Sequence, residues 1–459
     1  MMVYQIVNPA TGIAESSYPT ATDDQIRGSL AEAGDAYKTW RHVPVDERCT
    51  VLRRASELLL ERKDKLAETI TREMGKRFVD AQSEIDIASS IVRYYADNAA
   101  ALLADIPRQT ESGGKAFVRK TPIGVILGVM PWNYPYYQVV RFAAPNLAAG
   151  NTVLVKHAAQ CPQTALDLQE LFLDAGAPVG AYVGTFPSHD QIESMIADDR
   201  VAGVSLTGSE GAGSAIAALA GKHLKKVVLE LGGSDPYLIL DTDDMEDTVF
   251  HATKARLSNG GQSCNGGKRF IVVEDHYDKF VEKLTVSFAE KVPGDPFDPT
   301  VAYGPMSSVQ ARDELAEQVR DAISAGAEAT TGGRPVQRAG AYFEPTVLVK
   351  VTPKARAFHE ELFGPVAIVY KVKDIDEAIE LANDSPYGLG AAVFHRDTSV
   401  AVDVAARLDV GMVWINEREG GGPELPFGGT KRSGFGRELG PEGIDEFVNR
   451  KLIHVPAGS

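Results

Sequence analysis

The stretch KKVVLELGGSDPYLIL, residues 225–240, contains two short apolar runs separated by the polar turn GGSD. Each run has the length and the aliphatic, partly β-branched composition of a strand. Apolar residues follow one another without alternation, which indicates strands buried on both faces, as in a parallel sheet covered by helices. These sixteen residues therefore predict an α/β protein.

Similar apolar runs extend this pattern in both directions and alternate with helical segments. On the N-terminal side they are GVILGVM (124–130), NTVLVK (151–156) and VAGVSLTG (201–208). On the C-terminal side they are RFIVVED, VAIVYKV, GAAVFH and GMVWIN. We group the runs up to PYLIL (236–240) as one series and expect a second α/β domain to follow.

The segments outside these two series differ from them. The first hundred residues predict helices, with a capping box at Thr22 and Gln25 and two longer helical stretches at roughly 46–75 and 78–104. The polar segment 106–122 predicts a projecting hairpin, and the last twenty residues contain the strand-like EFVNRKLIHV, which can pair with another subunit.

Composition excludes several classes of function. The chain has 459 residues and a formal net charge of −16, so nucleic acid and anionic membranes are unfavourable partners. Its three cysteines form no CxxC pair, which favours free thiols and a cytoplasmic location. We find no metal-ligand signature, no signal peptide and no apolar stretch of about 18 residues or more.

One of the three cysteines, Cys264, lies in NGGQSCNGGKR (259–269). A glycine-rich frame gives a side chain little apolar cover, which suits a reactive thiol. A buried structural cysteine is the alternative, and local context alone does not separate the two.

Three further motifs each allow a chemical and a structural interpretation. Glu230 ends an apolar strand and is either a general base or a solvent-facing carboxylate. Asn133, in MPWNYP, is either a donor to an oxyanion or a turn residue. The stretch LTGSEGAG (206–213) resembles a strand-to-helix turn at a dinucleotide, although it is not GxGxxG.

The order of these motifs is more informative than any one of them. The chain resembles the aldehyde dehydrogenase superfamily over essentially its whole length, and within it the bacterial succinate-semialdehyde dehydrogenases. The matching motifs are PWN (131–133), TGS (207–209) with Gly213, ELGG (230–233), GQSC (261–264), EELFGPV (360–366) and PFGG–K–SG–GRE (426–438).

The resemblance implies a role for each motif. Cys264 would form a thiohemiacetal with an aldehyde, Asn133 and the backbone N–H of Cys264 would hold the oxyanion, and Glu230 would activate the water that hydrolyses the thioester. Lys156 and Glu361 would contact ribose hydroxyls of the cofactor. The cofactor-binding positions that the resemblance implies are Trp132, Lys156, Ala159, Gly208, Ser209, Gly213, Leu231, Glu361 and Phe363.

Two departures from the family pattern affect the cofactor and the thiol. Many NAD-specific members have a glutamate where this chain has Ala159, so repulsion of a 2′-phosphate is absent and we expect NADP to be preferred, with NAD possible. The residue after the nucleophile is Asn265, not a second cysteine, so we expect no local disulfide switch.

The substrate carboxylate requires a local cation in an acidic protein. Arg141, eight residues after Asn133, is the leading candidate, and a helix-surface salt bridge is the alternative. A second arginine of some relatives is replaced here by Ser258, and Arg418 is a candidate substitute.

The expected fold is therefore the aldehyde-dehydrogenase-like α/β fold. We expect a Rossmann-type dinucleotide-binding domain at 1–105 and 123–234, a catalytic domain at 235–438 and an oligomerisation segment at 106–122 and 439–459 that forms a homodimer or homotetramer. The expected activity is NAD(P)-dependent oxidation of succinate semialdehyde. The alternatives are glutarate semialdehyde or a neutral aldehyde as substrate, a cysteine hydrolase, and a non-catalytic binding protein.

Overall fold

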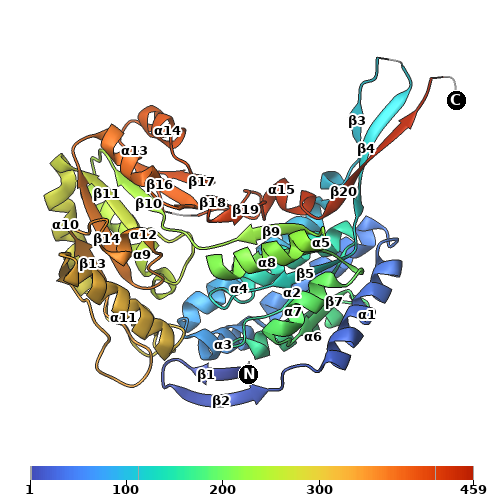
Figure 1. The fold of residues 1–459 in the computed structure, drawn as a ribbon, viewed down its shortest axis with the longest axis horizontal. Coiled ribbons are helices and arrows are strands. Elements are labelled where there is room, and N and C mark those ends of the chain that lie inside the picture. Colours follow the sequence, from blue (N-terminus) through green and yellow to red (C-terminus); the bar gives the residue numbers. More distant parts are fainter. Residues whose placement is uncertain (1–2, 112, 419, 458–459) are drawn as a thin grey trace.

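The computed structural model describes residues 3–111, 113–418 and 420–457. It contains two α/β units, each built around its own sheet, and a narrow arm that projects from the first unit (Figure 1). Residues 112 and 458–459 of the predicted oligomerisation segment lie outside the described residues. None of the described helices combines the length and apolar character that a membrane crossing needs.

The first sheet has the strand order β19-β9-β8-β5-β6-β7 and is parallel except for β19. Its strands are β5 (Val125–Val129), β6 (Thr152–Lys156), β7 (Tyr182–Thr185), β8 (Val201–Thr207), β9 (Lys226–Glu230) and β19 (Gly434–Phe435). The connecting helices are α5 (Tyr137–Ala149), α6 (Pro162–Asp174), α7 (His189–Ala197) and α8 (Glu210–Lys222). The expected runs at 124–130, 151–156 and 201–208 are thus confirmed as strands, while β7 was not anticipated.

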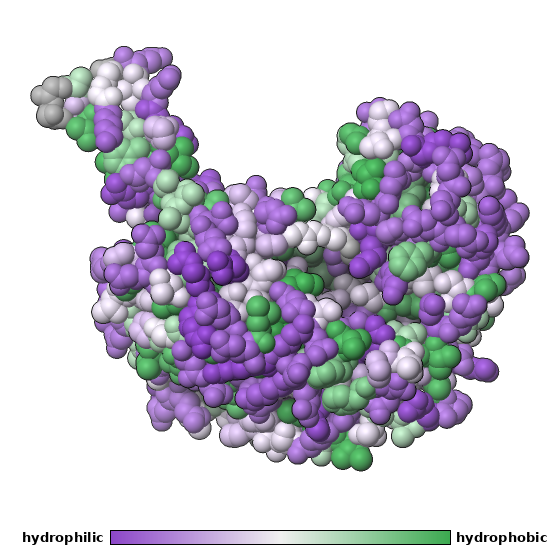
Figure 2. Space-filling view, turned by 180° about the vertical axis from the view of Figure 1, so that it is seen from behind, coloured by the Kyte–Doolittle hydropathy of each residue, from purple (hydrophilic) through white to green (hydrophobic). Residues whose placement is uncertain are grey.

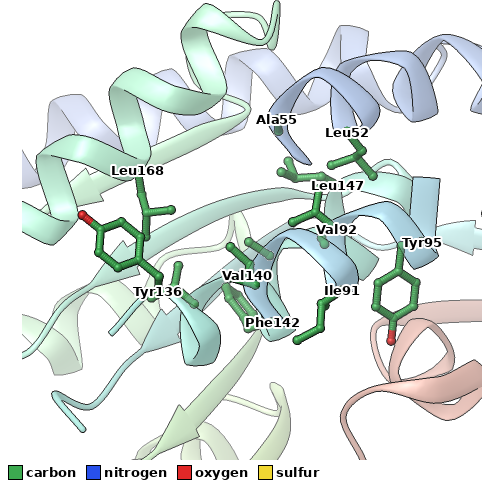
Figure 3. Close-up of a cluster of buried hydrophobic side chains, with 14 of the residues drawn as sticks. Leu52, Ala55, Ile91, Val92, Tyr95, Tyr136, Val140, Phe142, Leu147 and Leu168 are labelled. Atoms are coloured by element: carbon green, nitrogen blue, oxygen red, sulfur yellow. The ribbon is translucent and has the colours of Figure 1, made fainter. Parts of the chain in front are cut away.

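The N-terminal segment contributes helices to both faces of this sheet: its first helix packs on one face and the later helices on the other. Its helices are α1 (Asp23–Trp40), α2 (Val45–Glu61), α3 (Lys63–Met74) and α4 (Phe78–Leu102), preceded by the hairpin β1 (Tyr4–Asn8) and β2 (Ile13–Tyr18). Buried side chains of α2 and α4, among them Leu52 and Ile91, pack against α5 residues such as Val140 (Figure 3).

Two expectations for this segment are tested directly. The capping box is confirmed, because Thr22 accepts from the Gln25 backbone N–H and the Gln25 side chain accepts from Thr22. The helical stretch expected at 46–75 is confirmed, and it consists of two helices, because Arg62, with φ −103° and ψ 10°, separates α2 from α3. The hairpin β1–β2 was also missed.

The second sheet has the order β12-β13-β14-β11-β10-β16-β17, with only β12 antiparallel. Its strands are β10 (Pro236–Ile239), β11 (Arg269–Val273), β12 (Glu328–Thr331), β13 (Thr346–Val349), β14 (Val366–Val372), β16 (Gly390–Phe394) and β17 (Met412–Ile415). The accompanying helices are α9 (Met245–Leu257), α10 (Glu274–Ala289), α11 (Val309–Ser324), α12 (Arg356–His359), α13 (Ile375–Asn383) and α14 (Thr398–Ala405).

The run PYLIL (236–240) forms β10 of the second sheet, so its grouping with the first series of runs is wrong, although the expected catalytic domain, 235–438, already included it. The physical reason lies in the short connection. A parallel neighbour in the same sheet needs a crossover of a dozen or more residues, and only 231–235 separate β9 from β10. The GGSD turn therefore takes the chain out of one sheet and into the other.

The C-terminal part of the chain returns to the first unit. Strand β19 pairs with β9, and α15 (Gly440–Asp445) packs against α4 and α5. Buried residues Leu439, Ile444 and Phe447 belong to the core of the first unit. The short pair β15 (Tyr387–Gly388) and β18 (Thr430–Lys431) precedes this return.

The arm consists of β3 (Ile106–Arg108), β4 (Lys115–Pro122) and β20 (Val448–Val455), in the order β20-β4-β3. It projects from the first unit beside the C-terminus (Figure 1). Strand β20 pairs along its whole length with β4 of its own chain. The expected hairpin and C-terminal strand are confirmed, while the outer edge of β20 has no neighbouring strand among the described residues.

Candidate active site

The loop that contains Cys264 connects α9 to β11 through the single turn η1 (Ser258–Gly261). Asn259, Gly260 and Gly261 all have positive φ values, of 51°, 62° and 75°. A Cβ atom on Gly261 would lie 2.1 Å from the carbonyl oxygen of Gly364. Glycine is therefore required at Gly261 by the left-handed backbone and by a close backbone approach.

Cys264 differs from the other two cysteines in exposure. Cys49 and Cys161 are buried, Cys264 is partly exposed, and all three are free thiols. The Cys264 side chain lies on a cavity of about 620 Å³ that both units line. The cavity includes Tyr137, Arg141, Ser258, Arg418 and Phe427. The surface is also hollowed between the two units in the back view (Figure 2).

The surroundings of Cys264 favour a protonated thiol at rest. Burial raises the pKa of Cys264 to about 12, against the opposing effect of the nearby cations Arg141 and Lys268. A nucleophilic thiolate is thus only a minor species at neutral pH. The thiol therefore requires a base or additional positive potential when it reacts.

Glu230 is not among the residues that line the 620 Å³ cavity, so its candidacy as that base rests on its own chemistry. It lies at the end of β9, is buried, and neither carboxylate oxygen has a hydrogen-bond partner among the described residues. Loss of hydration raises the pKa of Glu230 well above its usual value, while Arg141 lowers it. The alternative of a solvent-facing carboxylate is therefore wrong.

Asn133 connects the two units. Its Nδ2 donates to the carbonyl oxygen of Gln262 at 3.2 Å, and an amide nitrogen retains a second N–H for another acceptor. Its own carbonyl oxygen accepts from Lys76 Nζ at 2.9 Å and from Asn259 Nδ2 at 3.0 Å. Asn133 therefore does more than form a turn after β5.

Arg141 is fully buried on α5. The alternative of a salt bridge on the helix surface is therefore wrong. Its Nε donates to Glu438, and the guanidinium lies 4.4 Å from the Phe427 ring centroid and 5.2 Å from that of Tyr137. Nη1 donates to the Tyr137 hydroxyl at 3.5 Å. The third guanidinium nitrogen, Nη2, has no partner among the described residues. A buried donor of this kind can bind an anion in the cavity.

Glu438 is a functional candidate that sequence reasoning did not single out. It is buried, accepts from Arg141, and accepts from Ser205 Oγ at 3.2 Å. It also raises the pKa of Glu230. The signal was present, because Glu438 is the last residue of the GRE motif, but sequence does not show that it contacts Arg141.

The two weaker substrate candidates are in the predicted region. Ser258 and Arg418 both line the 620 Å³ cavity and an adjacent groove of about 1160 Å³. The backbone N–H of Arg418 donates to His251 Nδ1 at 3.3 Å. Their positions are compatible with contacts to a substrate tail.

The turn between β8 and α8 is closely packed, as a dinucleotide site requires. Ser209 is the N-cap of α8 and accepts from the backbone N–H of Ala212 at 3.4 Å. A Cβ atom on Gly213 would lie 2.6 Å from the Leu231 side chain. The Gly208 N–H donates to the Glu230 carbonyl at 3.0 Å, which ties this turn to the end of β9.

Trp132 of the first unit lies beside Phe363 and Glu361 of the second unit. The rings of Trp132 and Phe363 pack edge to face with centroids 5.6 Å apart. Both residues and Glu361 line a cavity of about 310 Å³. Glu361 accepts from the Gly233 N–H at 3.2 Å and from Lys268.

Lys156 ends β6 and is buried without a hydrogen-bonding or ionic partner among the described residues. Burial lowers the pKa of its ammonium to about 8. His157 has a structural role: it contacts the Tyr182 hydroxyl at 3.2 Å, and burial lowers its pKa to about 3. Ala159 presents only a methyl group, and its carbonyl accepts from Gln5 at 3.0 Å.

These features fit a phosphorylated dinucleotide. An unpartnered ammonium, an uncharged side chain three residues later and a helix N-terminus at a small-residue turn all favour anionic groups. Among the described residues, no cluster of three or more His, Cys, Asp or Glu side chains forms a potential metal site.

Known proteins provide independent comparisons. The sequence profile of the aldehyde dehydrogenase family matches residues 2–453. A Deinococcus radiodurans protein named succinate-semialdehyde dehydrogenase [NADP(+)] is 52% identical over 98% of this chain and 94% of its own. A Mycobacterium ulcerans protein named succinate-semialdehyde dehydrogenase [NADP(+)] 1 is 43% identical over 98% of both chains.

The similarity extends to solved structures. The crystal structure of succinic semialdehyde dehydrogenase from Streptococcus pyogenes in complex with NADP+ superposes with a TM-score of 0.97. It is 43% identical and covers 99% of this chain and 100% of its own. On the profile match, the identities and the shared fold, this chain belongs to the aldehyde dehydrogenase family.

Proposed function

We propose that this enzyme oxidises succinate semialdehyde to succinate with NADP as its preferred cofactor, NAD being accepted less well. The observation that best supports the substrate is the unpartnered Nη2 of Arg141, which lines the same cavity as Cys264. A substrate with a carboxylate at the far end from its aldehyde would satisfy that donor. The names of the similar proteins support the same substrate and cofactor.

The chain's own residues would divide the chemistry as follows. Cys264 sulfur attacks the aldehyde carbon, and its proton passes to Glu230 or to solvent. The oxyanion accepts hydrogen bonds from the second N–H of Asn133 Nδ2 and from the Cys264 backbone N–H. NADP, when bound, accepts the hydride. Glu230, once deprotonated, removes a proton from the water that hydrolyses the thioester.

The preference for NADP rests on Lys156 and Ala159. The ammonium of Lys156 has no anionic partner in residues 3–111, 113–418 and 420–457, so a 2′-phosphate would be its counter-ion. Ala159 adds no negative charge that would repel the phosphate. Lys156 and Glu361 are also the proposed contacts to the ribose hydroxyls, and Trp132 and Phe363 the proposed walls of the cofactor cleft.

The substrate proposal is tested by charge-balanced removal of the guanidinium. Removing Arg141 alone would leave Glu438 buried and unpaired, which destabilises the fold by about 3–5 kcal/mol. The double variant Arg141→Gln/Glu438→Gln removes both charges and so avoids leaving either one buried and unpaired. The measurement is kcat/KM for succinate semialdehyde and for butanal, because damage to the shared chemistry cancels in their ratio.

We expect the ratio to fall by roughly 30- to 100-fold, since a charge-assisted hydrogen bond contributes about 2–3 kcal/mol. Equal losses for both aldehydes would contradict the role of Arg141. Turnover of glutarate semialdehyde tests the alternative substrate. A preference for NAD of tenfold or more, about 1.4 kcal/mol, would contradict the cofactor proposal.

We also propose the domain division and assembly expected from sequence, with one adjustment. The pairing of β19 with β9 supports assigning residues from 434 to the first unit rather than ending the catalytic domain at 438. The open edge of β20 and the exposed Leu452 support assembly of a homodimer or homotetramer through the arm. A cytoplasmic location remains a prediction from the free thiols.

A further inference from the structure

The segment 258–268, which connects α9 to β11 and carries Cys264, is called the nucleophile loop below. Lys268 is a buried cation on this loop, four residues after Cys264. Its Nζ donates to the main-chain oxygens of Ser263 at 2.9 Å, Cys264 at 2.7 Å and Gly266 at 3.4 Å. It also lies 3.1 Å from Oε1 of Glu361. An ammonium has three N–H donors, so these four oxygens compete for it.

The contact with Ser263 affects the oxyanion donor directly. The Ser263 carbonyl and the Cys264 N–H belong to the same planar, trans peptide group, so they point in opposite directions. Holding the carbonyl on the Lys268 ammonium therefore fixes where the Cys264 N–H points. The positive charge also polarises that peptide, which strengthens the N–H as a donor.

The contact with Glu361 connects this peptide to the cofactor side. Glu361 lines the cavity that Trp132 and Phe363 also line. It has little room to move, because a Cβ atom on Gly232 would lie 2.2 Å from its Oε2. A ribose hydroxyl that donates to Glu361 would compete with Lys268 for the carboxylate, and the ammonium would then bind the loop carbonyls more strongly.

The charged and titratable groups that face Cys264 come from every element packed around it. They are Tyr137 and Arg141 on α5, Asp235 after β9, Lys268 on the nucleophile loop and Glu361 after α12. Arg141 and Lys268 favour the thiolate, whereas Asp235 and Glu361 oppose it. Of these groups, Lys268 contacts both the loop and Glu361.

We propose that Lys268 is a positioning residue that orients the Ser263–Cys264 peptide and links it to Glu361, so that cofactor binding changes the reactivity of the Cys264 thiol. The link to cofactor binding rests on the proposed role of Glu361 at the ribose. The orientation of the Ser263–Cys264 peptide by Lys268 does not depend on that role.

The test uses the full-length enzyme and the rate of Cys264 alkylation by iodoacetamide across pH, with and without NADP. The variants are Lys268→Met, Lys268→Arg and Glu361→Gln, and Lys373→Met on the exposed surface is the control. Alkylation needs no aldehyde, and NADP binding is followed separately by fluorescence titration. A failure of the proposed function is therefore distinguishable from a failure of this inference.

In Lys268→Met we expect alkylation about tenfold slower near neutral pH, a pH profile displaced to higher pH, and no response to NADP. Lys268→Arg should restore part of the rate. Glu361→Gln removes a charge that opposes the thiolate, so its alkylation should be faster than wild type and should lose the NADP response. If Lys268→Met retains the wild-type profile and response, the inference is wrong. If Lys268→Met does not fold, Glu361→Gln still tests the inference. An NADP response that persists in Glu361→Gln would contradict the link between cofactor binding and the reactivity of Cys264.

Discussion

Lys156 and Lys268 are both buried lysines at one end of an interior sheet strand, yet their surroundings are opposite. Lys156, at the end of β6, has no partner within the described part of the chain, and its pKa is lowered to about 8. Lys268, just before β11, contacts three carbonyl oxygens and the Glu361 carboxylate. The first ammonium is available to a ligand, whereas the second holds the protein's own backbone.

The difference shows how to interpret a buried cation. Burial without a partner is unfavourable, so its persistence indicates a function that supplies the partner. A buried cation that contacts several protein oxygens instead holds those groups in position. Its removal would leave the oxygens of the loop without a donor. Both residues are lysines in short polar stretches of sequence, and only their contacts separate the two roles.

The largest expected effect is on the free energy of unfolding. Equal losses on replacing Lys156 and Lys268 would contradict the contrast between the two lysines. Lys268→Met leaves several buried carbonyls without a donor and should lower the free energy of unfolding by about 2–4 kcal/mol. Lys156→Met removes an ammonium that already lacks a partner, so we expect a change below about 1 kcal/mol. Urea unfolding followed by circular dichroism measures both. A similar loss for Lys156→Met would show that Lys156 is partnered.

The next effect concerns the cofactor and sharpens the role of Lys156. Ala159→Glu introduces a carboxylate three residues after Lys156, which should pair with the ammonium and repel a 2′-phosphate. We expect the ratio of kcat/KM for NADP to that for NAD to fall roughly 30-fold, about 2 kcal/mol. Ala159→Gln, similar in size but uncharged, is the control. If both variants lower the ratio equally, bulk rather than charge is responsible.

The smallest effect is a pH dependence that only the unpartnered lysine should produce. The pKa of Lys156 is lowered to about 8, so its ammonium is present below that pH and is lost as the pH rises through it. NADP affinity should therefore weaken above about pH 8, approaching tenfold per pH unit, while NAD affinity changes less. Fluorescence titration of both cofactors across this range provides the measurement. Lys156→Arg, which stays charged, should remove the difference.

Much of this arrangement could be predicted from the sequence, and the failures have physical causes. Unbroken apolar runs gave the parallel strands, but the assignment of β10 needed the rule that five residues cannot form a parallel crossover. Cys264, Glu230 and Asn133 were identified by their motifs. The motifs did not show how deeply these three residues are buried or which hydrogen bonds they make, because they lie far apart along the chain, between positions 133 and 264.

The residues that sequence reasoning missed are those that act through contacts with other parts of the chain. Glu438 lies 297 positions from Arg141, and Lys268 reaches Glu361 across a different element. Both residues lie in motifs quoted from the sequence, but no local pattern shows which distant side chains they contact. Hairpin β1–β2 was missed for a related reason, because its strands pair with each other outside the two series of apolar runs.

The hydrogen bonds from Asn133 to Gln262 and from Asn259 to Asn133 join a turn of the first sheet to the nucleophile loop of the second. The proposed oxyanion donor and the thiol are thus brought together by docking, not by either sheet alone. A small hinge opening between the units would separate them while leaving both cores folded. Inactivation by mild denaturant should then precede the loss of secondary structure and reverse fully on dilution, so that an inactive molecule of this kind is a latent enzyme rather than a damaged one.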